Sequence, residues 1–256
     1  MIRIFLGNVG SGKTISAVRE LVLAEDNPFY LPTYSNIITK KKGCYKLTKN
    51  HLITREMLVS KEVVKIKKNG EEEFKIKFNA EFWKSLRNKH NGFNVVIDEA
   101  HTLIEARSFM SRQNRVMNDF LALIRKVCNS PENDSTLTLI SQLDSRLDIN
   151  ARKLCTEVRY HIGLYDKRCL KCGCYWSEHS DMSDFRKRKK CPSCGGYRLK
   201  KFDYRIIVHF FKNMNDYEEW KYHGIDTVEQ TLKICNIEKY FPYYDTMQMD
   251  DLISEE

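Results

Sequence analysis

The chain contains 256 residues, of which 42% are hydrophobic, and it carries a formal net charge of +9 at pH 7. A globular chain of this length can bury a sizeable core, either as one large domain with an insertion or as two small domains. It has no apolar run of about 18 residues and no signal-peptide pattern at its start, so we expect a cytoplasmic protein without membrane insertion. The positive charge permits a polyanionic partner, but generic surface lysines explain it equally well.

The first predicted element is a strand at residues 2–6, followed at once by the sequence GNVGSGKT. Its spacing fits the Walker A pattern, in which glycines let backbone N–H groups surround a polyphosphate at the start of a helix. In such a loop Lys13 would reach the β and γ phosphates of ATP, and Thr14 would offer its hydroxyl to Mg²⁺. The predicted nucleotide-binding residues are Gly7, Asn8, Val9, Gly10, Ser11, Gly12, Lys13 and Thr14.

Three elements are predicted before the next chemical motif. Apolar residues at helical spacing indicate a helix over residues 13–25, and PTYSNI at 32–37 reads as a strand. Alternating apolar residues on both sides of Asn69-Gly70 predict a β-hairpin over residues 62–78. Its lysines are typical of a solvated edge, with DNA contact as the alternative.

A second nucleotide-site motif is FNVVIDEAH at residues 93–101. A buried parallel strand that ends in two carboxylates is typical of a Walker B element, because its C-terminal edge faces the nucleotide. Asp98 would hold the Mg²⁺ shell, and Glu99 would orient and deprotonate the attacking water.

The elements that follow extend the same α/β alternation. Residues 112–128 are predicted to form a long amphipathic helix, and STLTLISQ at 135–142 a third strand. Gln142 stands where a polar side chain can sense the γ phosphate or position water, and capping of the strand end is the alternative interpretation.

The order of these motifs resembles the Zot-like branch of the FtsK–HerA superfamily of DNA-pumping ATPases. The resemblance covers about residues 1–165, and its more selective parts are Ser35-Asn36, Arg107, Arg125, Gln142 and the sequence LDINAR, which ends at Arg152. That branch includes morphogenesis proteins of filamentous phages and genome-packaging ATPases of tailless viruses. The resemblance implies a homo-oligomeric ring, expected to be a hexamer, in which a neighbour's arginine completes the site. Arg152 and then Arg125 are the candidates, with a surface salt bridge as the alternative role.

Two CxxC pairs, CLKC at 169–172 and CPSC at 191–194, stand outside that resemblance. Pairs at this spacing are typical of a structural Zn²⁺ site, because each turn presents two thiolates and the two turns close a tetrahedron. The expected ligands are Cys169, Cys172, Cys191 and Cys194. Cys174 could replace Cys172, and His179 is a weaker substitute.

The loop between the cysteine pairs carries the basic run RKRKK. On a zinc ribbon such a run is a plausible phosphate-contacting tip, and a contact with a capsid protein or a neighbouring subunit is the alternative. The expected DNA-contacting residues are Arg186, Lys187, Arg188, Lys189 and Lys190.

We therefore predict an α/β fold, a RecA-like P-loop NTPase core with a mainly parallel sheet flanked by helices, plus an inserted small zinc ribbon. The core is placed at residues 1–165, the ribbon at 166–200, and the continuation of the core with an acidic C-terminal tail at 201–256.

The predicted function is an ATP-hydrolysing translocase of double-stranded DNA that packages a viral genome. It would use ATP, Mg²⁺ and Zn²⁺, work in the host cytoplasm or with the virion, and contact a capsid or portal-vertex protein. Two alternatives remain. One is a Zot-like ATPase for virion assembly or extrusion that acts with a membrane partner, and the other is a nucleotide-gated zinc-ribbon adaptor that binds nucleic acid with little turnover.

Overall fold

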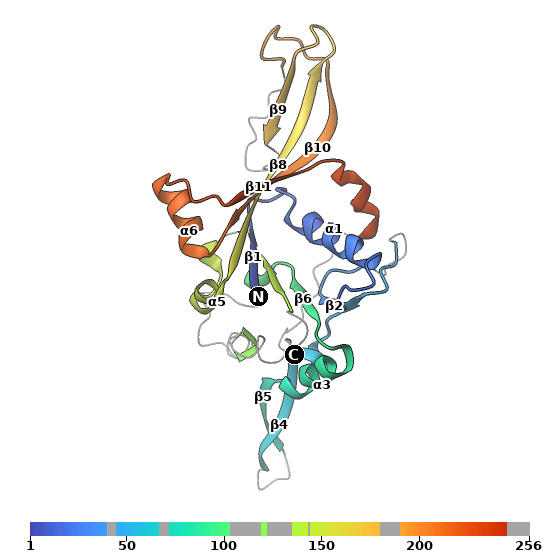
Figure 1. Cartoon of the computed structure of the whole chain (residues 1–256), viewed down its shortest axis with the longest axis vertical. Helices are drawn as coiled ribbons and strands as arrows, with labels where there is room; N and C mark the ends of the chain where they lie inside the picture. The colour runs from blue at the N-terminus through green and yellow to red at the C-terminus, as the bar shows by residue number, and fades with distance from the viewer. Residues whose placement is uncertain are drawn as a thin grey trace.

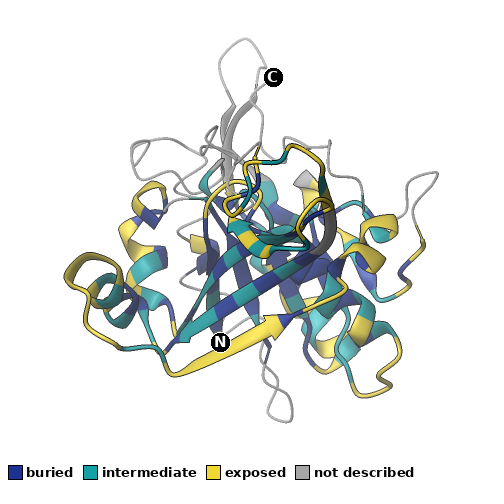
Figure 2. Ribbon diagram, turned by 90° about the horizontal axis from the view of Figure 1, so that it is seen from above, coloured by how far each residue is buried: buried dark blue, intermediate teal, exposed yellow. Residues whose placement is uncertain are grey.

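The computed structural model describes residues 1–39, 45–66, 72–102, 119–121, 135–142, 144–179 and 190–244. Its centre is a nine-stranded sheet with helices on both faces (Figure 1). Buried strands form the middle of this sheet, and exposed residues lie on the surrounding helices and loops and on the edge strand at residues 230–234 (Figure 2). Among the described residues, no helix is both long and apolar enough to cross a membrane.

Most of the sheet is parallel. Its order is β11-β10-β8-β1-β7-β6-β2-β3, and the six strands from β8 to β3 run parallel to one another. These strands are β8 (Glu157–Cys169), β1 (Ile2–Leu6), β7 (Leu137–Ile140), β6 (Asn94–Ile97), β2 (Thr33–Ser35) and β3 (Asn50–Leu52). The antiparallel strands β10 (Leu199–Phe211) and β11 (Gln230–Ile234) complete one side, and β9 (Tyr175–His179) pairs with the outer half of β8. The predicted α/β fold with a mainly parallel sheet is confirmed.

The core forms because the parallel strands are apolar on both faces. In β1, Ile2, Ile4 and Phe5 are fully buried, as expected for a central strand covered by helices. Helix α1 (Lys13–Glu25), predicted over the same residues, turns Ile15 and Val18 into this core. The other helices whose bounds lie among the described residues are α2 (Arg55–Leu58), α3 (Ala80–His90), η1 (Ala100–Thr102), η3 (Asp144–Arg146), α5 (Ile149–Leu154), α6 (Met214–Glu218), η4 (Glu219–His223) and η5 (Ile237–Tyr243).

Helix α3 was not predicted from the sequence. The side chain of Asn79 caps its start by accepting a hydrogen bond from Phe82 N at 3.3 Å, and Asn91 ends it in the left-handed region at φ 53°. Trp83, which is completely buried, anchors the helix to the core. Most of its other residues are polar, so tertiary packing of one ring outweighs a weak apolar pattern.

Two projections leave the body of the molecule in opposite directions (Figure 1). The outer halves of β8 and β10, together with β9, form an arm that we call the zinc arm, comprising the described residues within 166–200. At the other end, β4 (Val59–Ile66) and β5 (Glu72–Phe78) form the antiparallel hairpin that the sequence predicts. Its Asn69-Gly70 turn lies outside the described residues.

Several other expectations also fall outside the described residues. Of the helix predicted at 112–128, only residues 119–121 are described, and they are helical. Arg107, Arg125 and the acidic tail are not described. The division of the chain into core, ribbon and continuation stays a prediction.

Candidate nucleotide and metal sites

The Walker A loop connects β1 to α1 and has the backbone shape that its glycines allow. Gly7 and Gly12 have φ values of 145° and 92°, in the region that L side chains rarely adopt. A Cβ atom at Gly7 would lie 2.5 Å from the carbonyl oxygen of His161, and one at Gly12 would lie 2.3 Å from Ile206 Cδ1. The loop therefore approaches β8 and β10 so closely that these positions require glycine.

Lys13 lies inside this loop. Its Nζ donates hydrogen bonds to the carbonyl oxygens of Gly7 at 2.8 Å and Asn8 at 2.9 Å, and the side chain is buried. The ammonium is thus fixed at the N-terminal end of α1, where helix geometry already favours an anion. A polyphosphate in this loop would meet both the charge and the backbone N–H groups.

The end of β6 brings Asp98 to the other side of the loop. The Thr14 hydroxyl is hydrogen-bonded to the Asp98 carboxylate, so the two predicted Mg²⁺ ligands lie together. Burial raises the pKa of Asp98 to about 6, and the neighbouring Glu99 carboxylate adds to the rise, while the hydrogen bond from Thr14 opposes it. Because its charged form is disfavoured here, a divalent cation would be a fitting partner, and oxygen ligands suit Mg²⁺.

Asn36, directly after the neighbouring strand β2, fixes the backbone of Asp98. Its side-chain amide donates to the Asp98 carbonyl at 2.9 Å, and its Oδ1 accepts from Asp98 N at 2.7 Å. The sequence singled out Asn36 only through the family resemblance; the structure gives it a physical task, which is to hold the Walker B backbone.

Glu99 has an unusual backbone and several partners. Its φ is 50°, a conformation that costs a residue other than glycine free energy and often occurs at functional sites. Gln142 Nε2 donates to Glu99 Oε1 at 3.1 Å, and His101 Nδ1 lies 3.2 Å from Glu99 Oε2. The predicted sensor Gln142 is therefore in direct contact with the predicted catalytic carboxylate.

Two residues near Glu99 were not singled out from the sequence. His101 follows the Walker B motif in the printed sequence, and Arg146 Nη1 lies 3.5 Å from His101 Nε2. A histidine two positions after an acidic residue is a weak signal by itself. The contact between His101 and Arg146 could not be predicted from the sequence, because it forms only when the fold brings η3 beside η1.

Of the two candidate trans-acting arginines, only Arg152 lies among the described residues. It stands in α5, with Nη1 3.6 Å from Glu218 Oε1 of α6 in the same chain. Both side chains are partly exposed, so this ion pair contributes little stability. The contact is the surface salt bridge that the sequence analysis gave as the alternative role of Arg152. Its action on the site of a neighbouring subunit stays a prediction.

At the end of the zinc arm, the four cysteines of the two CxxC pairs converge. Their Sγ atoms all lie within 4.8 Å of one another, and the Cys169–Cys194 and Cys172–Cys191 separations are both 3.6 Å. Four thiolates around Zn²⁺ at about 2.3 Å stand about 3.8 Å apart, so the arrangement fits a tetrahedral site. A disulfide is excluded for these two pairs, because its S–S distance is about 2.05 Å.

Backbone turns preorganise both cysteine pairs. Gly173 N donates to the Cys169 carbonyl at 2.9 Å, and Gly195 N donates to the Cys191 carbonyl at 3.0 Å. Burial would raise the pKa of Cys191, but N–H groups of the following turn outweigh it and lower this pKa to about 6. This turn therefore favours the thiolate, which is the metal-binding form.

Of the alternative ligands, Cys174 lies beside this cluster and its side chain interacts with that of Cys191. Its Sγ also contacts the carbonyl oxygen of Tyr175 at 3.9 Å, and it is not among the four Sγ atoms that all lie within 4.8 Å of one another. Of the basic run, only Lys190 is described, and it is exposed, with its ammonium 5.0 Å from the Tyr197 ring centroid. Residues 186–189 lie outside the described residues.

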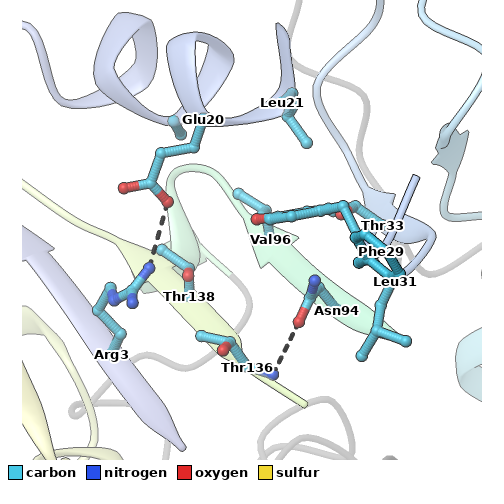
Figure 3. Close-up of a pocket in the computed structure, with 12 residues that line it drawn as sticks. Arg3, Glu20, Leu21, Phe29, Leu31, Thr33, Asn94, Val96, Thr136 and Thr138 are labelled. Atoms are coloured by element: carbon cyan, nitrogen blue, oxygen red, sulfur yellow. Dashed lines mark hydrogen bonds and ion pairs between the residues drawn. The ribbon is translucent and has the colours of Figure 1, made fainter. Parts of the chain in front are cut away.

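Two cavities flank α1. The first, of about 280 Å³, lies beside the P-loop and is lined by Lys13, Thr14, Glu99 and Gln142 together with several aromatic side chains. The second, of about 310 Å³, lies at the starts of β1, β6 and β7 (Figure 3). There Arg3 is paired with Glu20 at 3.2 Å, and Asn94 accepts a hydrogen bond from Thr136 N. Ligands of parallel α/β sheets bind at the carboxyl ends of the strands, so the first cavity is the candidate nucleotide site.

The family model described as "Zonular occludens toxin (Zot)" matches residues 1–186 of the chain. The match thus includes both Walker motifs and β8 but ends before Cys191. No curated protein matches the chain significantly.

Several solved structures share the general arrangement at low sequence identity. The N-terminal domain of zonular occludens toxin from Neisseria meningitidis is 16% identical with a TM-score of 0.46, and the match covers 95% of this chain and 98% of that one. The genome packaging NTPase of Sulfolobus turreted icosahedral virus 2, in complex with ATP-gammaS, is 15% identical with a TM-score of 0.38, over 62% of this chain and 74% of that one. A KaiC-like protein from Pyrococcus horikoshii is 11% identical with a TM-score of 0.37, over 81% and 89% of the two chains.

Proposed function

The chain belongs to the zonular occludens toxin (Zot) family, and from that premise we propose that it is an ATP-hydrolysing translocase of double-stranded DNA that packages a viral genome. The observation that carries the ATPase part is the convergence of Lys13, Thr14, Glu99 and Gln142 on one cavity at the carboxyl edge of the sheet. These groups are of the kinds that P-loop NTPases use, together with Mg²⁺, to transfer a phosphoryl group to water.

Each residue has a defined task in this proposal. Lys13 and the P-loop N–H groups bind the phosphates, and Thr14 and Asp98 would hold Mg²⁺, which supplies positive charge to the β and γ phosphates. Glu99 accepts a proton from the attacking water and fixes its position. Gln142 holds the Glu99 carboxylate at 3.1 Å and stands where it can respond to the γ phosphate.

The DNA-moving part rests on less direct support, namely family membership and the basic character of the chain. A homo-oligomeric ring, expected to be a hexamer, would let hydrolysis in one subunit act on the next, with Arg152 reaching the neighbouring site. The zinc arm, held by Cys169, Cys172, Cys191 and Cys194, would carry residues 186–190 toward the DNA backbone. Contacts to phosphates would give affinity without choice of sequence.

A second candidate is an ATPase for virion assembly or extrusion that acts on a membrane partner, and membership of the Zot family is equally compatible with it. Both candidates hydrolyse ATP, so hydrolysis alone does not separate them. Stimulation by DNA does, because only a DNA translocase couples turnover to contact with a duplex.

The test is steady-state ATP hydrolysis by the full chain with and without blunt double-stranded DNA. We expect basal hydrolysis that rises on addition of DNA, and loss of both activities in Lys13→Ala because the phosphates lose their fixed counter-charge. Hydrolysis without any response to DNA over a range of lengths would favour the assembly ATPase. Absence of hydrolysis with retained ATP binding would instead indicate a nucleotide-gated adaptor.

A further inference from the structure

The lining of the cavity beside the P-loop is of two chemical kinds. Its polar side chains include the phosphate-binding groups Lys13 and Thr14 with Glu99 and Gln142. The cavity also has four aromatic residues, which we call the aromatic end: Tyr165, Tyr204, Phe241 and Tyr244. Phosphate chemistry does not explain these rings, because aromatic faces do not bind phosphate.

The aromatic end is fixed to the P-loop by direct contacts. Tyr165 and Tyr204 are register partners on β8 and β10, and their rings stack with centroids 4.7 Å apart at 25°. The Tyr204 hydroxyl donates a hydrogen bond to the carbonyl oxygen of Gly10 at 2.8 Å. The aromatic residues therefore keep a constant position relative to the P-loop.

Phe241 stands at the rim of this cavity on η5. The same helix buries Ile237 and Tyr240 against α1 and β10, so these two residues fix η5 in place. Phe241 is 42% exposed, with its centroid 6.5 Å from that of Tyr204. Its ring is thus a partly open apolar surface that the core does not need.

We infer that the aromatic end is the subsite for the base of the bound nucleotide, with Phe241 as a stacking residue. The inference rests on the proposed function and specifies its substrate. A nucleoside triphosphate has a charged end and a flat aromatic end, and the cavity offers a matching partner to each. Stacking on aromatic side chains accepts every base, since every base has a π face.

The chemistry of this end also predicts weak discrimination between purines. Among the described residues that line the cavity, those at the aromatic end carry no carboxylate and no amide that could read a base edge. Stacking on the face of a ring therefore selects little between ATP and GTP.

The test compares binding of ATP, GTP and inorganic tripolyphosphate, each with Mg²⁺, by the full chain and by Phe241→Ala. Tripolyphosphate reports on the P-loop alone because it lacks a base. We expect Phe241→Ala to weaken ATP and GTP about 5- to 30-fold each and to leave tripolyphosphate binding unchanged. Phe241→Tyr, which keeps a ring, should bind ATP like the wild type. Phe29→Ala is the matched control, since Phe29 is 91% exposed and lies outside this cavity.

Three results would overturn the inference alone, each in a distinguishable way, and a fourth would overturn the proposed function as well. Equal ATP affinity in Phe241→Ala and the wild type would show that the base does not stack on Phe241. An equal loss of ATP and tripolyphosphate binding would show that Phe241 acts through the loop rather than on the base. A strong preference of the wild type for ATP over GTP would contradict a subsite that reads only the flat face. Failure of the wild type to bind both ATP and tripolyphosphate would overturn the proposed function itself, and the base subsite with it.

Discussion

The nucleotide edge and the zinc arm are built on the same two long strands but are stabilised by different means. In the inner halves of β8 and β10, Val158, Ile206 and Val208 are buried in the core. In the described part of the arm, the buried residues are Lys167, Cys169 and Cys191. Apolar burial thus holds the catalytic edge, whereas two of the three buried arm residues are thiols that can bind metal.

The polar contacts of the arm do not replace a core. Lys167 forms an ion pair with Glu178, and Trp176 Nε1 donates to the same carboxylate at 2.8 Å. Arg205 pairs with Asp166 at 3.0 Å at the base of the arm. The Arg205–Asp166 pair lies nearer solvent, where an ion pair typically contributes about 1 kcal/mol or less. In the more buried Lys167–Glu178 pair, the attraction between the charges is largely offset by the hydration that they lose. We therefore predict that folding of the arm depends on a bound metal ion, whereas the nucleotide site keeps its shape without that metal.

Removal of the metal should have the largest effect, and it tests directly whether only the arm depends on it. Structural Zn²⁺ sites have an apparent binding free energy of about 10–16 kcal/mol, and it stabilises the arm because only the folded arm forms the site. We expect one Zn²⁺ per chain, and its removal by a chelator should unfold the arm, seen as new protease cleavage within residues 166–200. Binding of ATP should persist, measured on the same sample.

Point variants make the metal prediction specific. Cys172→Ser should lose the metal, whereas Cys174→Ser should keep it, because Cys174 stands outside the four-cysteine group. Retention of metal by Cys172→Ser with loss in Cys174→Ser would exchange the two ligand assignments. Loss of ATP binding together with the metal would mean that the two regions are not independent.

The next largest effect concerns whether the catalytic edge is complete within one subunit. An arginine supplied by a neighbour can be worth about 10³- to 10⁵-fold in rate. We expect Arg152→Ala to lose hydrolysis on that scale and Glu99→Gln to be strongly impaired as well. Mixing the two variants should restore part of the activity, because an intact site can then meet an intact arginine.

A matched variant tests the intrachain pair of Arg152. Glu218→Gln removes the ion-pair partner but leaves the arginine, so it should keep or raise activity. Mixed assemblies that form normally but stay inactive in every ratio would contradict a trans-acting Arg152. The salt bridge with Glu218 would then be its full role.

Loss of the catalytic base should have a somewhat smaller effect. Glu99→Gln keeps the shape and the contact with Gln142 but cannot accept a proton, so kcat should fall by about 10²- to 10⁴-fold. ATP affinity and zinc content should remain at wild-type values, since neither the P-loop nor the arm changes. Wild-type hydrolysis by Glu99→Gln would make the assignment of the base wrong.

The parts of this molecule that could be predicted from sequence are those whose chemistry is local. The P-loop, α1 and the strand before Asp98 were placed because each depends on residues adjacent in the chain. The convergence of the four cysteines was predicted for a related reason, since CxxC spacing itself forms each turn. Strand β3 and helix α3 were missed because they are short or mostly polar, and their packing decides their structure.

The contacts that complete the candidate site join residues that are distant in sequence, and no local sequence pattern predicts them. Tyr204 bonds to Gly10 across 194 positions, and Gln142 meets Glu99 across 43. Gln142 was identified only as the polar end of a strand, without its partner. The aromatic end of the cavity was missed entirely, because its members come from β8, β10, η5 and Tyr244 directly after η5, which only the fold brings together.

The smallest expected effect concerns the basic run on the arm. Replacing Arg186, Lys187, Arg188, Lys189 and Lys190 with neutral residues should weaken binding to all DNA sequences alike, because phosphate contacts carry no sequence information. Each lost contact should also reduce the slope of log affinity against log salt by about 0.9, since fewer counterions are released on binding. Basal hydrolysis without DNA should survive, as Lys13 and Glu99 are untouched.

Neutralising Lys84 and Lys89, which are exposed on α3, is the control for general loss of charge and should leave the slope nearly unchanged. If the run instead meets carboxylates of a capsid protein or a neighbouring subunit, the salt slope for DNA will stay at the wild-type value while assembly is lost. Affinity measured at several salt concentrations, together with the size of the assembly, therefore decides which polyanion the arm contacts.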